Sequence, residues 1–100
     1  MIADVPLTTV ARAFEVLETV RDLGGASVSE LTAELELLKS TVHDYVTTLA
    51  RLGYLTNADG EYDLGLTFLT HGQYAQDELA LADRVQPPLE ALAEETNEIV

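Results

Sequence analysis

The sequence contains no cysteine. Disulfides and thiolate metal sites are therefore excluded, and the fold must be held together by packing or by a partner subunit. The same absence favours a reducing, cytoplasmic setting. No stretch approaches the roughly 18 consecutive apolar residues that a membrane span requires, and the N-terminus has no basic flank typical of a targeting signal. We therefore expect a cytoplasmic protein that does not enter a membrane.

Basic residues are also scarce. Five Lys and Arg stand against eighteen Asp and Glu, which gives a formal net charge of -13. Because phosphate neutralisation normally supplies most of the affinity for nucleic acid, this charge alone argues against DNA binding. The acidity is spread along the chain, and Lys39 is the only lysine. Both features are typical of a halophilic protein working in concentrated salt, where charges are screened within about 3 Å at ~1 M. An ordinary acidic domain is the alternative.

Hydrophobic periodicity predicts three helices in the first half of the chain. The length suffices for one small core of about 60 to 70 residues plus an appendage. Thr8 or Thr9 can cap the first helix and Ser29 the second, and Gly53 can end the third in the left-handed conformation. The predicted ranges are 9–23, 30–35 and 38–52, with a strand-like step at 26–28. No glycine or proline separates the second helix from the third, so one continuous helix is the alternative.

A β-hairpin is predicted next. Residues 54–56 and 61–64 flank the turn-rich tetrapeptide 57–60, in which Gly60 can adopt a positive φ. Helical spacing of apolar residues returns after residue 65, and Pro87-Pro88 must start or kink the last helix. The fold class is thus mainly α with a small β-hairpin: a winged helix-turn-helix followed by a linker helix and a further helix.

Specific sequence blocks narrow this architecture. They occur in the order Val10-Ala11-Arg12-Ala13-Phe14-Glu15-Val16-Leu17, Val28-Ser29-Glu30-Leu31, Leu38-Lys39-Ser40-Thr41-Val42-His43, Gly53-Tyr54-Leu55 and Tyr62-Asp63-Leu64-Gly65. Together they resemble the N-terminal domain of the IclR-type transcriptional regulators, and the block Lys39 to His43 is the most specific part. Residues 84–96 resemble the opening helix of that family's effector-binding domain.

The resemblance implies a cytoplasmic regulator that binds double-stranded operator DNA as a homodimer. It also implies a response to a small-molecule effector through a C-terminal domain absent from these 100 residues. The expected division is a winged helix-turn-helix DNA-binding domain at 1–65, a linker helix at 66–80, and the first helix of a truncated effector-binding domain at 81–100. No cofactor is expected.

The chain departs from the family pattern in three places. Asp44 and Tyr45 follow His43 where the family usually has an arginine and an aliphatic residue, so an anion replaces the usual cation. The turn before the third helix has Leu37-Leu38 where glycine and proline are usual. The hairpin is acidic, with carboxylates at Asp59, Glu61 and Asp63.

The predicted DNA-binding face lies opposite the apolar stripe of the third helix, which comprises Leu38, Val42, Val46 and Leu49. Hydroxyls and backbone N–H groups at the start of this helix suit phosphate, and a carboxylate can accept from the amino group of cytosine. The alternative to DNA contact is that this helix face is simply solvated. For Arg12 and Arg51, the alternative to phosphate contact is an ordinary surface ion pair. The expected DNA-binding residues are Arg12, Ser29, Lys39, Ser40, Thr41, His43, Asp44, Thr47, Arg51 and Asn57, the last at the hairpin tip. Tyr62 is expected to cover the core and Tyr45 to be half-buried.

Leu66, Leu69, Gln73 and Gln76 are expected to share one side of the linker helix. Helix packing in a dimer is the predicted use of this side, and docking on an effector domain is the alternative. An enzyme is not expected, because the only histidines, His43 and His71, lack supporting residues at catalytic or metal-binding spacing. The competing function is an acidic protein-interaction module that dimerises with or modulates another regulator without binding DNA.

Overall fold

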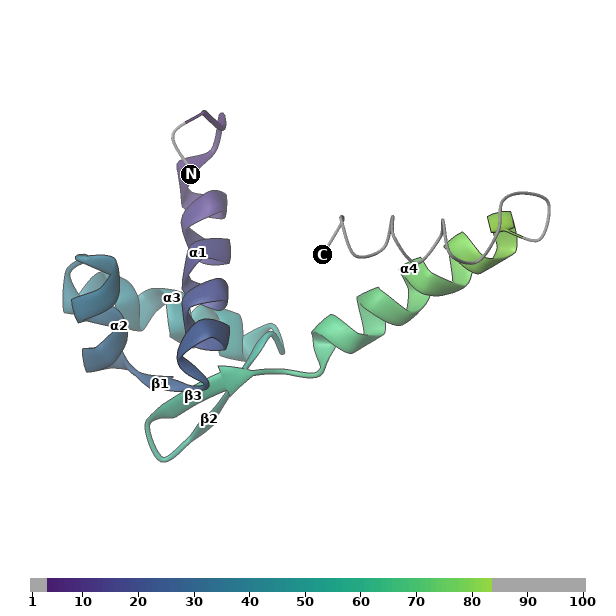
Figure 1. Cartoon of the computed structure of the whole chain (residues 1–100). Coiled ribbons are helices and arrows are strands. Elements are labelled where there is room, and N and C mark those ends of the chain that lie inside the picture. Colours follow the sequence, from purple (N-terminus) through teal and green to yellow (C-terminus); the bar gives the residue numbers. More distant parts are fainter. Residues whose placement is uncertain (1–3, 84–100) are drawn as a thin grey trace. The chain divides into compact units, whose positions relative to one another are not determined.

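A computed structural model describes residues 4–83 (Figure 1). Its elements are α1 (Thr8–Leu23), β1 (Ala26–Ser27), α2 (Val28–Leu35), α3 (Lys39–Arg51), β2 (Leu55–Ala58), β3 (Glu61–Leu64) and α4 (Thr67–Asp83). The predicted fold class, mainly α with a β-hairpin, is confirmed. α2 and α3 are separate, so the single continuous helix is excluded. The predicted last helix and the Pro87-Pro88 kink lie outside the described residues.

The chain divides into two units, residues 1–68 and 69–100. The first unit has a core to which every element from α1 to β3 contributes, and its buried members are Val16, Leu17, Val20, Ala26, Leu31, Val42, Val46, Leu49, Leu55 and Tyr62. Tyr45 packs partly buried against this core, and Tyr62 lies within it, so both predictions for these tyrosines are confirmed. In the part of the chain that is described, no helix is long and apolar enough to cross a membrane.

Three apolar residues of the predicted stripes lie on the surface. Leu38 is 74% exposed, because it precedes α3 as its N-cap residue with an extended backbone. Its predicted place in the buried stripe is therefore wrong. On α1, Val10 and Phe14 are each more than half exposed, and the buried positions lie further along the helix.

The helix starts differ from those predicted. α2 begins at Val28 and is capped by Ser27, whose Oγ accepts from the Glu30 N–H at 3.2 Å, while the Glu30 Oε1 accepts from the Ser27 N–H at 2.8 Å. A capping box requires a serine three residues before the glutamate. Ser27 occupies that position, whereas Ser29 directly precedes Glu30. The prediction that Ser29 caps α2 is thus wrong. α1 begins after Leu7 with no side-chain cap, so the expected cap by a threonine is wrong as well.

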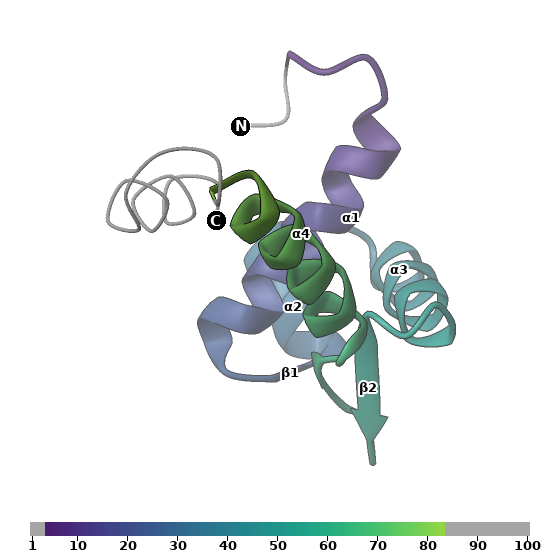
Figure 2. The same ribbon diagram turned by 90° about the vertical axis from the view of Figure 1, so that its right-hand side faces the viewer.

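The hairpin turn is shorter than predicted. β3 is the central strand of a three-stranded antiparallel sheet in the order β1-β3-β2. Asn57 pairs with Tyr62 in this sheet, which leaves only Asp59 and Gly60 in the turn. Both have positive φ, 54° and 88°, as a type I′ turn requires. The paired hairpin forms the wing, and Figures 1 and 2 both show it projecting beyond the helices of this unit.

The base of the wing is closed by a tight backbone contact. The Gly65 N–H donates to the Tyr54 carbonyl at 2.8 Å, and a Cβ at Gly65 would collide with the carbonyl oxygen of Gly53. Gly53 has a φ of 90°, so its predicted left-handed conformation is confirmed. The Tyr54 and Phe68 rings meet edge to face with centroids 4.9 Å apart. These contacts fix the wing's base against the end of α3.

We expect Gly65→Ala to lower the free energy of unfolding by about 1–3 kcal/mol, because the added methyl group forces two backbone segments apart. Gly72→Ala is the matched control. A Cβ there meets no described atom within 4 Å, and alanine in a helix is favoured over glycine by roughly 0.5–1 kcal/mol. Urea denaturation of both variants measures the difference. Equal effects of the two substitutions would contradict the close approach at Gly65.

Candidate nucleic-acid interface

α3 buries one face and exposes the other. Val42, Val46 and Leu49 are buried in the core. The opposite face carries polar side chains, of which Thr41 and Thr47 are half-buried and the exposed ones are Lys39, Ser40, His43, Asp44, Thr48 and Arg51. Five of the seven predicted α3 candidates are thus exposed, and Thr41 and Thr47 are half-buried. Contact of all seven with DNA stays a prediction.

Thr48 is an exposed residue of this face that the sequence prediction missed. The helical wheel put Thr47 on the polar face, but the structure leaves Thr47 only half-buried and Thr48 exposed. Spacing from Asp44 could have identified it, because residues four apart lie one above the other on a helix.

The N-terminal end of α3 is open. Leu38, its N-cap residue, makes no side-chain capping bond. The first backbone bond of the helix runs from the Val42 N–H to the Leu38 carbonyl at 3.0 Å, so the N–H groups of Lys39, Ser40 and Thr41 precede the helical ladder. An uncapped N-terminus combines free donors with the positive end of the helix dipole, and both attract an anion. The capping box of α2 closes the corresponding end of that helix.

A three-residue turn joins α2 to α3. Glu36 ends α2 in the left-handed conformation, with a φ of 56°, and its N–H donates to the Thr32 carbonyl at 3.0 Å. Leu37 packs partly buried against the core. The turn thus forms without a glycine, at the cost of a strained backbone at Glu36.

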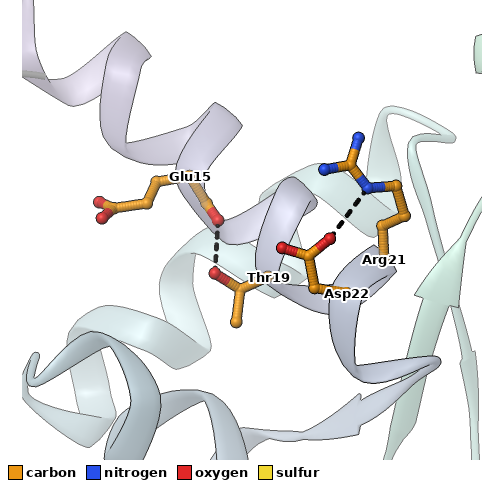
Figure 3. Close-up of polar contacts among 4 residues, drawn as sticks. All are labelled: Glu15, Thr19, Arg21 and Asp22. Atoms are coloured by element: carbon orange, nitrogen blue, oxygen red, sulfur yellow. Dashed lines mark hydrogen bonds and ion pairs between the residues drawn. The ribbon is translucent and has the colours of Figure 1, made fainter. Parts of the chain in front are cut away.

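The cations of α1 are already paired. The Arg12 Nη1 lies 3.7 Å from the Glu15 Oε1. Figure 3 shows the Arg21 Nε donating to the Asp22 Oδ1 at 3.2 Å, and the Thr19 hydroxyl bonded back to the Glu15 carbonyl oxygen. Arg21 and Asp22 are exposed, and an exposed pair of this kind contributes little stability. Arg12 and Glu15 are half-buried.

Lys39 and Arg51 are different. Both are exposed, and neither has an ion pair within residues 4–83. They stand at the first and last residues of α3. The two cations without an acidic partner in this part of the chain therefore flank the exposed face of a single helix.

The wing supplies no cation. Residues 52–83 contain neither lysine nor arginine, and Asp59, Glu61 and Asp63 are all exposed. The carboxylates of Glu61 and Asp63 lie close to Gly25, the residue that precedes β1. Their Oε2 and Oδ2 atoms are 2.7 and 3.5 Å from the position that a Cβ on Gly25 would occupy. Contact between this wing and a phosphate backbone requires a cation that bridges the two, or protonation of the wing carboxylates.

Asn57 is not at the hairpin tip, which corrects the sequence prediction. Its Oδ1 accepts from the Gly60 N–H at 2.9 Å, and its Nδ2 donates to the Tyr62 hydroxyl at 3.4 Å. The amide therefore holds the turn and ties it to a core tyrosine. A two-residue Asp-Gly turn draws Asn57 into the strand, which the tetrapeptide interpretation did not anticipate.

The remaining candidates are exposed. Ser29 is an exposed residue near the start of α2. Leu66 and Leu69 are 79% and 62% exposed, and Gln73 and Gln76 are exposed on α4, where the Gln73 Nε2 donates to the Asp77 Oδ1 at 3.3 Å. No group of three or more potential metal-ligating side chains comes together among the described residues.

Comparison with known proteins gives one consistent family. The model of the IclR helix-turn-helix domain matches residues 9–59. The chain is 33% identical over 91 residues to a probable HTH-type transcriptional regulator, ArcR, of Halobacterium salinarum, which covers 90% of this chain and 35% of the relative. It is 33% identical over 93 residues to the HTH-type transcriptional regulator KipR of Bacillus subtilis, covering 92% of this chain and 37% of that protein.

A solved structure has the same fold. Pseudomonas aeruginosa HmgR superposes with a TM-score of 0.65 at 23% identity, over 74% of this chain and 33% of that chain. The winged helix-turn-helix is thereby confirmed. The chain spans about a third of the length of the curated relatives it matches.

We expect Glu36→Gly to raise the free energy of unfolding by roughly 0.5–1 kcal/mol, because glycine adopts the left-handed conformation without steric cost. Glu34→Gly is the control: it removes the same charge from the last turn of α2, where glycine in the helical conformation costs up to about 1 kcal/mol. The midpoint temperature of thermal unfolding should rise for Glu36→Gly and fall for Glu34→Gly. A loss of stability in both would show that Glu36 is not strained.

Proposed function

The chain belongs to the IclR helix-turn-helix family, and on this premise we propose that it binds double-stranded operator DNA as part of a transcriptional regulator in the cytoplasm. The relatives are HTH-type transcriptional regulators by name. The observation that carries the proposal is the uncapped N-terminus of α3, beside which Lys39, Ser40 and Thr41 stand at the surface or half-buried.

In this proposal the start of α3 binds phosphate. The hydroxyls of Ser40 and Thr41 and the free N–H groups donate to phosphate oxygens, and the Lys39 ammonium supplies charge. The exposed face that continues from there enters the major groove with His43, Asp44 and Thr47, and Arg51 reaches the backbone. Arg12, Ser29 and Asn57 are proposed contacts at the margin, Arg12 after exchanging Glu15 for a phosphate.

We propose that two copies bind together, since a two-fold operator requires two recognition helices. Leu66, Leu69, Gln73 and Gln76 would form the contact, and the high exposure of the two leucines supports this use. A small-molecule effector would act through a C-terminal domain beyond these 100 residues, as the resemblance of residues 84–96 suggests. The proposed division at 1–65, 66–80 and 81–100 belongs to the same hypothesis.

A second function is favoured by one observation, the wing with three exposed carboxylates and no cation. In this second function, the acidic winged helix binds another regulator and does not bind DNA. The two functions differ in whether any duplex binds.

Removing the hydroxyls at the start of α3 should abolish the retarded band that the parent forms with its own upstream region. We expect Ser40→Ala with Thr41→Ala to lose at least ten-fold in affinity, because each lost phosphate contact is worth roughly 1 kcal/mol or more. The matched control, Thr8→Ala with Thr9→Ala, removes two hydroxyls from the start of α1. Unchanged binding by the α3 variant would refute its assignment as the recognition helix.

Salt should not weaken binding in the usual way. Among the lysines and arginines within residues 4–83, only Lys39 and Arg51 lack an ion pair, and so few cations release few counterions. Carboxylates near phosphates must also take up cations as the complex forms. We therefore expect log affinity to stay flat or rise with log salt. A slope near -3.6, expected for about four neutralised phosphates per dimer, would contradict this.

The same titration, extended to ~2 M salt with cognate and random duplexes, separates the two functions, because screening there leaves only short-range contacts. Sedimentation measured in parallel reports self-association. Dimers that bind no duplex at any salt concentration would favour the interaction module.

A further inference from the structure

The Asp44 carboxylate makes no hydrogen bond or ion pair with the described residues 4–83. It is exposed in the interior of α3, away from the helix N-terminus where an aspartate is favourable. Aspartate is also among the weaker helix-forming residues. No contact within residues 4–83 therefore accounts for an aspartate at this position.

The surroundings of Asp44 on the helix offer it no compensating charge. The residues three and four positions away, which are its neighbours on the helix surface, are Ser40, Thr41, Thr47 and Thr48. All four carry hydroxyls. Arg51 stands two turns further along the same face, about 10 Å away along the axis at 1.5 Å per residue. The carboxylate is thus free to accept a hydrogen bond at the centre of the face.

Within the major groove an acceptor-only group has few choices. Guanine presents two acceptors there and thymine an acceptor and a methyl group, so both repel a carboxylate. Only the exocyclic amino groups of cytosine and adenine donate. The adenine amino group lies between two acceptors, its own N7 and the O4 of the paired thymine. The cytosine amino group has an acceptor on one side only, the O6 of its guanine.

We propose that Asp44 accepts a hydrogen bond from the N4 amino group of a cytosine and so sets the base preference at one position of each half-site. The inference rests on the proposed function, because it requires α3 in the major groove. It adds a specificity-determining residue and the base that this residue selects. Thr48, exposed one turn further on, borders the same position.

The test compares the parent chain with Asp44→Asn on a panel of duplexes. The parent's preferred duplex is first selected from a randomised pool at the salt concentration of tightest binding. Each base pair is then varied, and affinity is measured by fluorescence anisotropy. We expect the parent to favour cytosine over the other bases at one position by on the order of ten-fold.

Asp44→Asn should change which base is preferred. An amide both donates and accepts and therefore pairs with adenine N6 and N7, so the preference should move from cytosine to adenine at that position alone. Asp59→Asn is the matched control: it removes the same charge from the exposed wing turn, where asparagine also tolerates a positive φ. It should strengthen binding to all duplexes alike and leave the preference unchanged.

A cytosine analogue lacking the exocyclic amino group gives an independent readout. Placed at the selected position, it should weaken binding by the parent and leave Asp44→Asn unaffected. If the parent binds duplexes but Asp44→Asn keeps the parent's preference, the assignment of Asp44 is overturned while DNA binding stands. If the parent binds no duplex under any condition, the proposed function falls, and this inference falls with it.

Discussion

The whole arrangement depends on the burial of one face of α3. Val42, Val46 and Leu49 pack into a core shared with α1, α2 and the sheet, and each such side chain stabilises the fold by roughly 1.5–3 kcal/mol. Because the helix has 3.6 residues per turn, fixing this stripe also fixes which side chains face outward. The exposed face of α3 is therefore a consequence of packing, independent of any charge that it carries. Its open N-terminus has another origin, the N-cap residue Leu38, whose side chain cannot accept a hydrogen bond.

Charge sets the second constraint. With a net charge of -13, these 100 residues offer no long-range attraction to DNA, and the exposed carboxylates of the wing would repel a phosphate backbone. What remains are short-range donors: free N–H groups, hydroxyls and the unpaired Lys39 and Arg51. Such contacts depend on geometry more than on ionic strength, so a fold that holds the α3 N-terminus rigidly matters more here than in a basic domain.

The helices, which many regularly spaced apolar residues indicate, could be predicted from the sequence. Caps and turns, which single hydrogen bonds decide, could not. Apolar spacing located every helix within the described residues and the side of α3 that is exposed, since many residues contribute to each signal. Caps and turns are decided locally. Ser27 and Ser29 both precede Glu30, and only the reciprocal bonding of Ser27 selects the cap. Asn57 likewise lies in β2, because only Asp59 and Gly60 occupy the turn, and its side chain supports that turn from the strand.

If α3 enters the major groove as proposed, the acidic residue on its exposed face changes how selectivity arises. A basic side chain adds affinity for every duplex through the phosphates, so its contribution to discrimination is diluted. In the proposed complex, the Asp44 carboxylate would instead oppose entry into any groove that offers no hydrogen-bond donor, and it would be tolerated only where a base amino group meets it. Selectivity of this kind comes from rejecting wrong sequences. Because the ratio of specific to non-specific binding governs occupancy, weak overall affinity is compatible with an accurate regulator.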